Sequence, residues 1–175
     1  MKKYIKLFIL LVIVAVFAAN GAVPQTTYVT YAAQEVSQDD ADVPSLWAGP
    51  EIDKARSLNL LTEKIQGRYR DNVTREELCE LTVKLYEALS GKKAAVPDAN
   101  PFTDTDNSEI IAANALGIVN GRGDGIFAPD DTATREEVSV MLYRTIKAAK
   151  PQYNLSLRNN YMFSDQDLIS PWARE

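Results

Sequence analysis

The chain has 175 residues, with 24 acidic and 19 basic side chains and a formal net charge of −5 at pH 7. An acidic chain is a poor partner for nucleic acid, whose binding depends on clustered lysine and arginine. The absence of histidine excludes His-based catalytic triads and His-ligated metal sites, and the single Cys79 permits no internal disulfide. A buried, inert thiol is the expected state of Cys79.

The first 44 residues are predicted to be an export signal followed by a spacer. Three lysines among the first six residues precede an apolar run at 7–19, which is typical of a secretory signal peptide at 1–22. The cleavage point stays open, and an uncleaved membrane anchor is the alternative. Residues 23–44 are polar and lack hydrophobic periodicity, which indicates a flexible spacer.

The phrase Thr-Arg-Glu-Glu occurs at residues 74–77 and again at 134–137, each time before an amphipathic run. A threonine at the N-cap with a glutamate three residues later forms a capping box, in which each side chain bonds the other residue's backbone N–H. The phrase therefore predicts two helix starts, with amphipathic runs at 78–89 and 138–146.

The arginine of the phrase is not explained by capping. A cation at the first helical position opposes the helix dipole at a cost of about 0.3–1 kcal/mol. Neither Arg75 nor Arg135 has an acid three or four residues later to offset that cost. Two interpretations stay open: a guanidinium beside free helix N–H groups that receives a carboxylate or phosphate, or a salt bridge to a distant acid.

An internal repeat surrounds the phrase. Residues 52–60 match 110–118 at an offset of 58, so each copy is predicted to be a helix, a loop and a helix. The narrow apolar stripes of such helices are buried only when neighbouring repeats pack together. In the second copy, alternate glycines from Gly121 to Gly125 allow positive φ, and Phe127 is expected to plug this loop onto the core.

These patterns predict four segments after the spacer. The third copy echoes Phe102-x-Asp at residues 163–165, and its Trp172 echoes Trp47; its first helix is then cut off by the end of the chain at Glu175, which suggests truncation. The predicted segments are repeat one at 45–92, repeat two at 101–149, a linker at 150–162 and the start of repeat three at 163–175.

No catalytic residue is expected. The paired carboxylates of the two phrases, which a glycosidase mechanism would need, are explained by their capping roles at helix starts. We therefore expect a non-enzymatic chain without a metal site or a cofactor. The alternative is an enzyme whose catalytic domain lies outside these 175 residues.

In this order, Phe-x-Asp, Trp-Ala, Leu-Gly-Ile-Val-x-Gly, Gly-x-Phe-x-Pro and Thr-Arg-Glu-Glu resemble the S-layer homology domain. The resemblance is nearly complete over Phe102 to Ala149 and thinner over the first copy. It implies a mainly α fold of helix-loop-helix units in a three-fold helical bundle, here incomplete. It also implies a secreted protein at the cell wall or S-layer, without a membrane segment after signal cleavage, that binds secondary cell-wall polysaccharide, often pyruvylated.

The resemblance assigns ligand contacts residue by residue. Arg75 and Arg135 would face grooves between repeats and receive an anionic sugar, Gly121 would allow its close approach, and Trp172 would offer a stacking face or instead pack its own unit. With fewer than three complete repeats, association into a homo-oligomer is expected unless the chain continues. A self-assembling surface-layer protein, or the anchor part of a wall-active enzyme, is the alternative.

Overall fold

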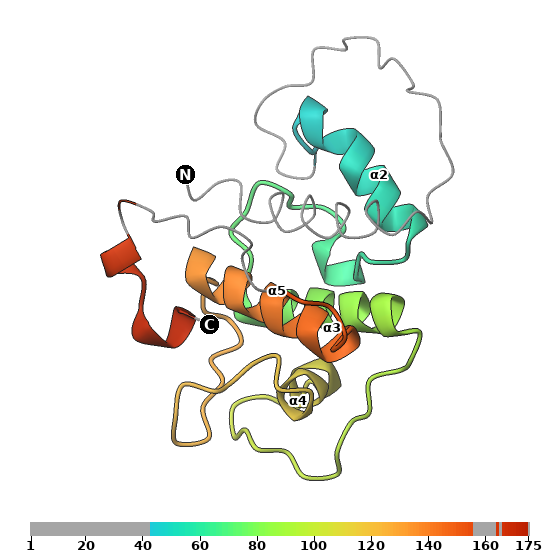
Figure 1. Ribbon diagram of the computed structural model, residues 1–175. Helices are drawn as coiled ribbons and strands as arrows, with labels where there is room; N and C mark the ends of the chain where they lie inside the picture. The colour runs from blue at the N-terminus through green and yellow to red at the C-terminus, as the bar shows by residue number, and fades with distance from the viewer. Residues whose placement is uncertain (1–42, 156–163, 165, 175) are drawn as a thin grey trace. The chain divides into compact units, whose positions relative to one another are not determined.

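The computed structural model describes residues 43–155, 164 and 166–174 (Figure 1). Within them the regular structure is helical apart from two isolated β-bridges, so the predicted mainly α fold class is confirmed. The chain divides into two compact units, Met1–Asn72 and Val73–Glu175, which are described separately. The two helices of the predicted repeat one (45–92) lie in different units. The bounds of this repeat and the three-fold packing therefore stay predictions.

Several predicted segments lie outside the described residues. These are the signal peptide at 1–22, the spacer up to residue 42, residues 156–162 of the linker, and Phe163 and Asp165 of the third copy. Among the residues that are described, no helix is both long and apolar enough to cross a membrane.

From residue 43 onward, where the structure describes it, the first unit contains one α-helix between two short 3-10 turns. The turn η2 (Leu46–Ala48) leads into α2 (Gly49–Ser57), and η3 (Glu63–Ile65) follows. A proline near the start of α2 suits the first turn of a helix, where a missing N–H costs nothing. Ile52 and Ala55 of α2 are buried, and the predicted first helix of repeat one is present.

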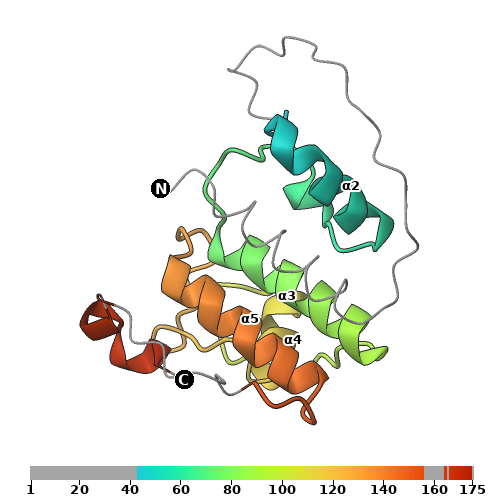
Figure 2. The same cartoon turned by 45° about the horizontal axis from the view of Figure 1, so that its top comes forward.

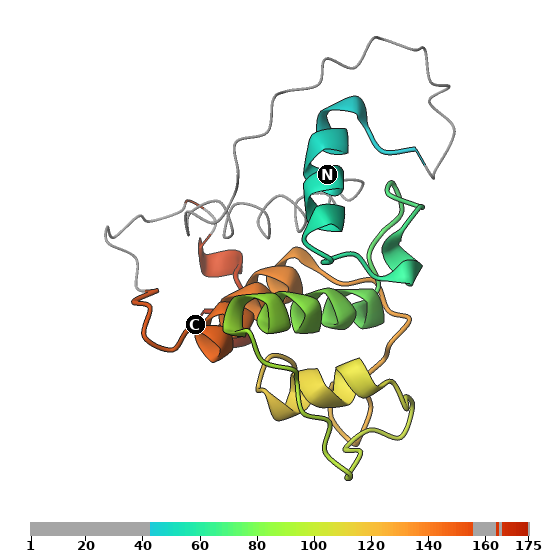
Figure 3. The same cartoon turned by 90° about the vertical axis from the view of Figure 1, so that its right-hand side faces the viewer.

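The described residues of the second unit form three α-helices, α3 (Arg75–Ser90), α4 (Ser108–Ala115) and α5 (Arg135–Ala149), and the short turns η4 (Gln166–Leu168) and η5 (Pro171–Ala173). Figure 2 shows α3 and α5 side by side and running in the same direction. Figure 3 shows α4 lying against α3. Their facing apolar side chains form the core: Leu78, Leu81, Leu85, Ile110, Ala113, Val138, Met141 and Leu142.

Both predicted capping boxes are present. Glu77 N donates to Thr74 Oγ1 at 3.2 Å, and Thr74 N donates to the Glu77 carboxylate at 2.9 Å. The second copy repeats this geometry between Thr134 and Glu137, at 3.2 and 2.8 Å. Each phrase thus starts its helix by local hydrogen bonds that span only three residues.

The glycine loop of the second repeat is a small hairpin closed onto the core. At its tip Asp124 and Gly125 have φ values of 51° and 73°, the positive pair that a two-residue hairpin turn requires. Phe127 is fully buried, as predicted, with its ring centroid 5.2 Å from that of Phe102. The Phe-x-Asp and Gly-x-Phe patterns therefore meet in space.

Asp104 completes this closure. Its carboxylate accepts the backbone N–H groups of Phe127 at 2.9 Å and Ala128 at 2.7 Å. These two backbone hydrogen bonds favour the ionised form and hold the pKa of Asp104 below its ordinary value of 3.8. The loop is thus tied to the segment that precedes α4.

Candidate functional site

The start of α3 is joined to the segment that leads into α5. Arg75 N donates to the Asp131 carbonyl at 2.9 Å, and Glu76 N donates to the Pro129 carbonyl at 3.0 Å. The helix N–H groups that the sequence suggested as an anion receiver are therefore already bonded in the first copy. The expectation of free N–H groups beside Arg75 was wrong, because a segment more than 50 residues away supplies their acceptors.

The Arg75 side chain is buried in contacts with the second repeat. Its Nη1 donates to the Glu137 carboxylate, its Nε donates to the Phe127 carbonyl at 3.0 Å, and its Nη2 donates to the Asn120 carbonyl at 3.3 Å. The guanidinium carbon also lies 4.6 Å from the centroid of the Phe127 ring, a cation–π geometry. For Arg75 the distant-acid interpretation is therefore realised, with a partner 62 residues along the chain.

Arg135 occupies the same position of the second phrase and has a different environment. Its side chain is exposed, and no ion pair joins it to another residue in the described part of the chain. Two identical four-residue phrases thus place their arginines in different environments: Arg75 is buried against the second repeat, whereas Arg135 is exposed.

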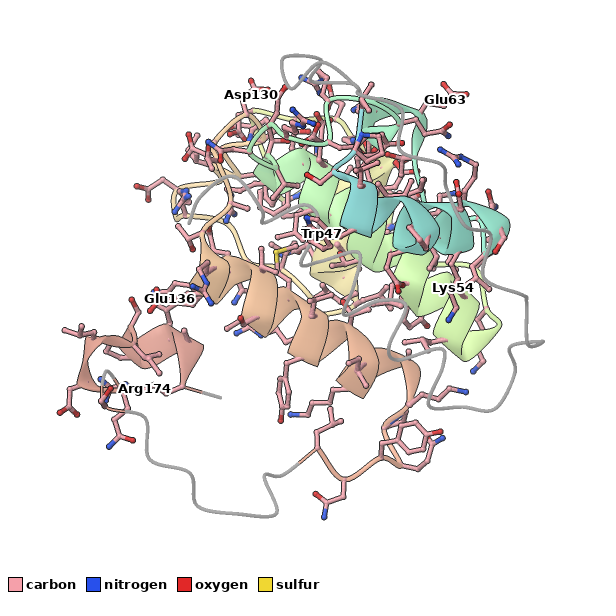
Figure 4. The ribbon with its side chains drawn as sticks, turned by 90° about the horizontal axis from the view of Figure 1, so that it is seen from above. Trp47, Lys54, Glu63, Asp130, Glu136 and Arg174 are labelled. Carbon is pink, nitrogen blue, oxygen red and sulfur yellow. The ribbon has the colours of Figure 1, made fainter. Side chains whose placement is uncertain are left out.

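The first glutamate of each phrase accepts hydrogen bonds from the residue that precedes another helical element, α4 or η5. Glu76 accepts from Asn107 Nδ2 at 2.7 Å, and Asn107 is the N-cap of α4. Glu136 accepts from the N–H and the hydroxyl of Ser170, at 2.8 and 2.9 Å, just before η5. Figure 4 shows Glu136 at the start of α5, facing the C-terminal segment that carries Arg174. This role could not be predicted from the sequence, because both partners lie about 30 residues away.

A cavity of about 500 Å³ opens between α5, the glycine loop and η5. Three guanidinium groups and one carboxylate form its charged wall, from Arg75, Arg122, Arg144 and Glu137. Trp172, half exposed, forms its aromatic wall. The volume lies within the range of about 300–1,000 Å³ that is usual for small-ligand sites.

Three of the four residues predicted to contact a ligand line this cavity. They are Arg75, Gly121 and Trp172, whereas Arg135 is not among its lining residues. Their assignment as ligand contacts stays a prediction, since no bound molecule tests it.

Gly121 also has a purely structural reason to be glycine. A Cβ built on it would stand 2.7 Å from the Ile126 carbonyl oxygen and 2.9 Å from the Phe102 ring. The hairpin backbone and the core aromatic leave no room for a side chain, whatever the cavity holds.

Two arginines of the cavity were missed from the sequence. Arg122 lies inside the glycine loop, where only the loop's geometry turns it toward the cavity. Arg144 follows Val140 by four residues and Met141 by three, and helical spacing puts all three on one face of α5. That spacing was the one available signal.

Cys79 is not part of the site. It is fully buried on α3, and burial raises the pKa of its thiol far above the ordinary value, which supports the expected inert thiol. No cluster of three or more Cys, Asp or Glu side chains that would suit a metal ion occurs among the described residues.

Comparisons with known proteins fall on the same part of the chain. Residues 98–139 match the family model of the S-layer homology domain. This range holds the contact of Phe102 with Phe127, the helix α4, the hairpin and the start of α5. The resemblance found in the second repeat is therefore confirmed.

Three relatives are long enzymes matched over a short region. "Exoglucanase XynX" of Acetivibrio thermocellus is 37% identical over 82 residues, which is 43% of this chain and 8% of that protein. "Amylopullulanase" of Thermoanaerobacterium thermosulfurigenes is 38% identical over 82 residues, 43% of this chain and 4% of that protein. "Endoglucanase" of Bacillus sp. (strain KSM-635) is 27% identical over 110 residues, 56% of this chain and 12% of that protein. The chain thus spans a small fraction of the length of each.

Proposed function

From the S-layer homology domain at residues 98–139, we propose that the chain is a non-catalytic module that anchors its protein at the bacterial cell surface. Domains of this family bind secondary cell-wall polymers. The proposed ligand is an anionic wall polysaccharide, and the proposed site is the cavity between α5, the glycine loop and η5.

The observation that carries this proposal is the pairing of an aromatic wall with a cationic one. The half-exposed indole of Trp172 offers a flat apolar surface for the C–H face of a sugar ring. The guanidinium groups across the cavity match the planar geometry of a carboxylate. A sugar that carries an acidic substituent satisfies both walls at once.

The charge balance favours an acidic sugar over a neutral one. Three arginines face one glutamate on the cavity wall, so the lining residues carry an excess of positive charge. A pyruvate ketal adds a carboxylate to a sugar and leaves one ring face apolar. A pyruvylated polysaccharide is therefore our proposed ligand within the anionic class.

The test uses the two tryptophans as a matched pair. Trp172 and Trp47 are each followed by alanine and are 50% and 52% exposed, but only Trp172 lines the cavity. We expect Trp172→Ala to lose co-sedimentation with isolated bacterial cell walls and Trp47→Ala to retain it. Walls extracted with hydrofluoric acid, which removes secondary polysaccharide, should bind neither the variants nor the unmodified chain. Equal binding to extracted walls, or full binding by Trp172→Ala, would overturn the proposal.

A second candidate follows from the enzyme names of the relatives. Their matched regions are 4–12% of proteins named exoglucanase, amylopullulanase and endoglucanase. We propose as the alternative that this chain anchors a polysaccharide-degrading activity to the wall. Release of reducing sugar from glucan or pullulan by the natural full-length product would support it, and an inactive product would leave anchoring alone.

A further inference from the structure

We propose that Arg122 is the residue that receives the anionic group of the ligand, and that it does so by exchanging its bond to Asp131 for one to the ligand. This inference rests on the binding function proposed above and adds the residue that selects for charge. Arg122 Nε lies 3.2 Å from Asp131 Oδ2, and its Nη2 lies 3.3 Å from Glu137 Oε1.

The buried arginine of the cavity is fixed in place. The side chains of Arg75 and Glu137 are 5% and 9% exposed, and the Arg75 donors point to Glu137 and to two backbone carbonyls. Turning Arg75 toward a ligand would leave a carboxylate buried without its main partner, which is strongly unfavourable. Arg75 is therefore a positioning residue, which holds Glu137 and the loop carbonyls where they are.

Arg122 is held much more loosely. Its side chain is 44% exposed, and its partner Asp131 is 56% exposed. Ion pairs between groups of such exposure contribute little to stability, because water screens them and solvates both partners when they separate. An incoming carboxylate offers Arg122 the same charge-assisted bonds, and the Asp131 side chain returns to water.

The positions of the two side chains allow Arg122 to leave Asp131 for a ligand in the cavity. Arg122 lines the cavity, whereas Asp131 is not among the lining residues. The Asp131 backbone stays anchored, since its carbonyl accepts from Arg75 N at 2.9 Å. The exchange therefore needs rotation of two exposed side chains and no movement of the loop backbone.

Glu137 is a single carboxylate in contact with two guanidinium groups, those of Arg75 and Arg122. Its carboxylate contacts both guanidinium groups, and the charge of Arg75 is neutralised by it at close range. Once the bond to Asp131 is released, Arg75 and Arg122 share the Glu137 carboxylate, and a carboxylate of the ligand balances the second of their two charges. A neutral sugar gives no reason to break that bond.

The experiment measures affinity for purified wall polysaccharide in two forms, native and with its carboxyl groups reduced to alcohols. We expect Arg122→Gln to weaken binding of the native polymer by at least about tenfold and to leave binding of the reduced polymer unchanged. Arg135→Gln removes the same charge outside the cavity and should bind both forms like the unmodified chain.

Asp131→Asn supplies the opposite perturbation. It removes the competing carboxylate, so the native polymer should bind about two- to fivefold more tightly, which is a fraction of the tenfold step that 1.4 kcal/mol gives. Unchanged far-UV circular dichroism would show that each variant folds.

Three results would overturn the inference: unchanged binding by Arg122→Gln, an equal loss in Arg135→Gln, or weaker binding by Asp131→Asn. If Trp172→Ala still abolishes binding in those cases, the anchoring function stands and the role of Arg122 alone fails. No binding of either polymer by the unmodified chain overturns both.

Discussion

Replacing Arg75 by alanine should destabilise the protein strongly. The change leaves the Glu137 carboxylate, 9% exposed, without its closest cation, and removal of one partner of a buried ion pair costs about 3–5 kcal/mol. It also leaves the buried Phe127 carbonyl without the 3.0 Å bond from Arg75 Nε. Arg122 still contacts Glu137, so we expect a loss near the lower end, about 3 kcal/mol.

The matched control is the same substitution in the second phrase. Arg135 is exposed and opposes the dipole of α5 at its first position. Arg135→Ala should therefore change the free energy of unfolding by less than about 0.5 kcal/mol, with a small gain as the expected sign.

The assay is urea unfolding followed by far-UV circular dichroism and by tryptophan fluorescence, because coincident transitions are needed before a single free energy is assigned. A double-mutant cycle with Glu137→Leu and Arg75→Met should give a coupling energy of about 2–3 kcal/mol. A loss below about 1 kcal/mol in Arg75→Ala, or equal losses in Arg75→Ala and Arg135→Ala, would refute the reasoning. Wall binding lost by Arg75→Ala would reflect lost packing as much as a lost contact.

Two further predictions concern the glycine loop. Gly121→Ala should cost about 1–3 kcal/mol, because its Cβ would meet the Ile126 carbonyl oxygen at 2.7 Å, whereas Gly49→Ala, with open space around it, should cost nothing in the same urea titration. The pKa of Asp104 is lowered by its bonds to backbone N–H groups such as that of Phe127, so its contribution to stability is present above about pH 4 and lost as pH falls through the lowered pKa. The difference in urea midpoint between the unmodified chain and Asp104→Asn should therefore be large at pH 6 and shrink at pH 3, and a difference independent of pH would contradict this.

The features that could be predicted from the sequence are those with short-range causes. Each capping box spans three residues, so the sequence contains both the donor and the acceptor, and the starts of α3 and α5 follow from it. The burial of Phe127 was also predictable, since a lone aromatic in a glycine-rich polar loop has few other places to go. The match of residues 98–139 to a known family rests on the same local patterns.

The fate of the two arginines could not be predicted, because it depends on a partner 62 residues away. Nothing near Arg75 or Arg135 in the sequence distinguishes one from the other, and the difference arises only when the second repeat packs on the first. The same holds for Arg122, whose neighbours Asp131 and Glu137 are brought to it by the hairpin. Tertiary packing brings the charged residues of the cavity together, whereas residues close in the sequence determine the helix starts.

Glu137 has two roles, and together they give the contact between successive repeats a direction along the chain. Its carboxylate caps its own helix and also accepts from Arg75, the arginine of the preceding copy of the phrase. Among the described residues this contact between successive copies is formed once, from Arg75 of the first phrase to Glu137 of the second. Duplication of a repeat copies both the arginine and the glutamate of this contact. The number of repeats, or the loop and cavity of one repeat, can therefore change while the contact between successive repeats is kept.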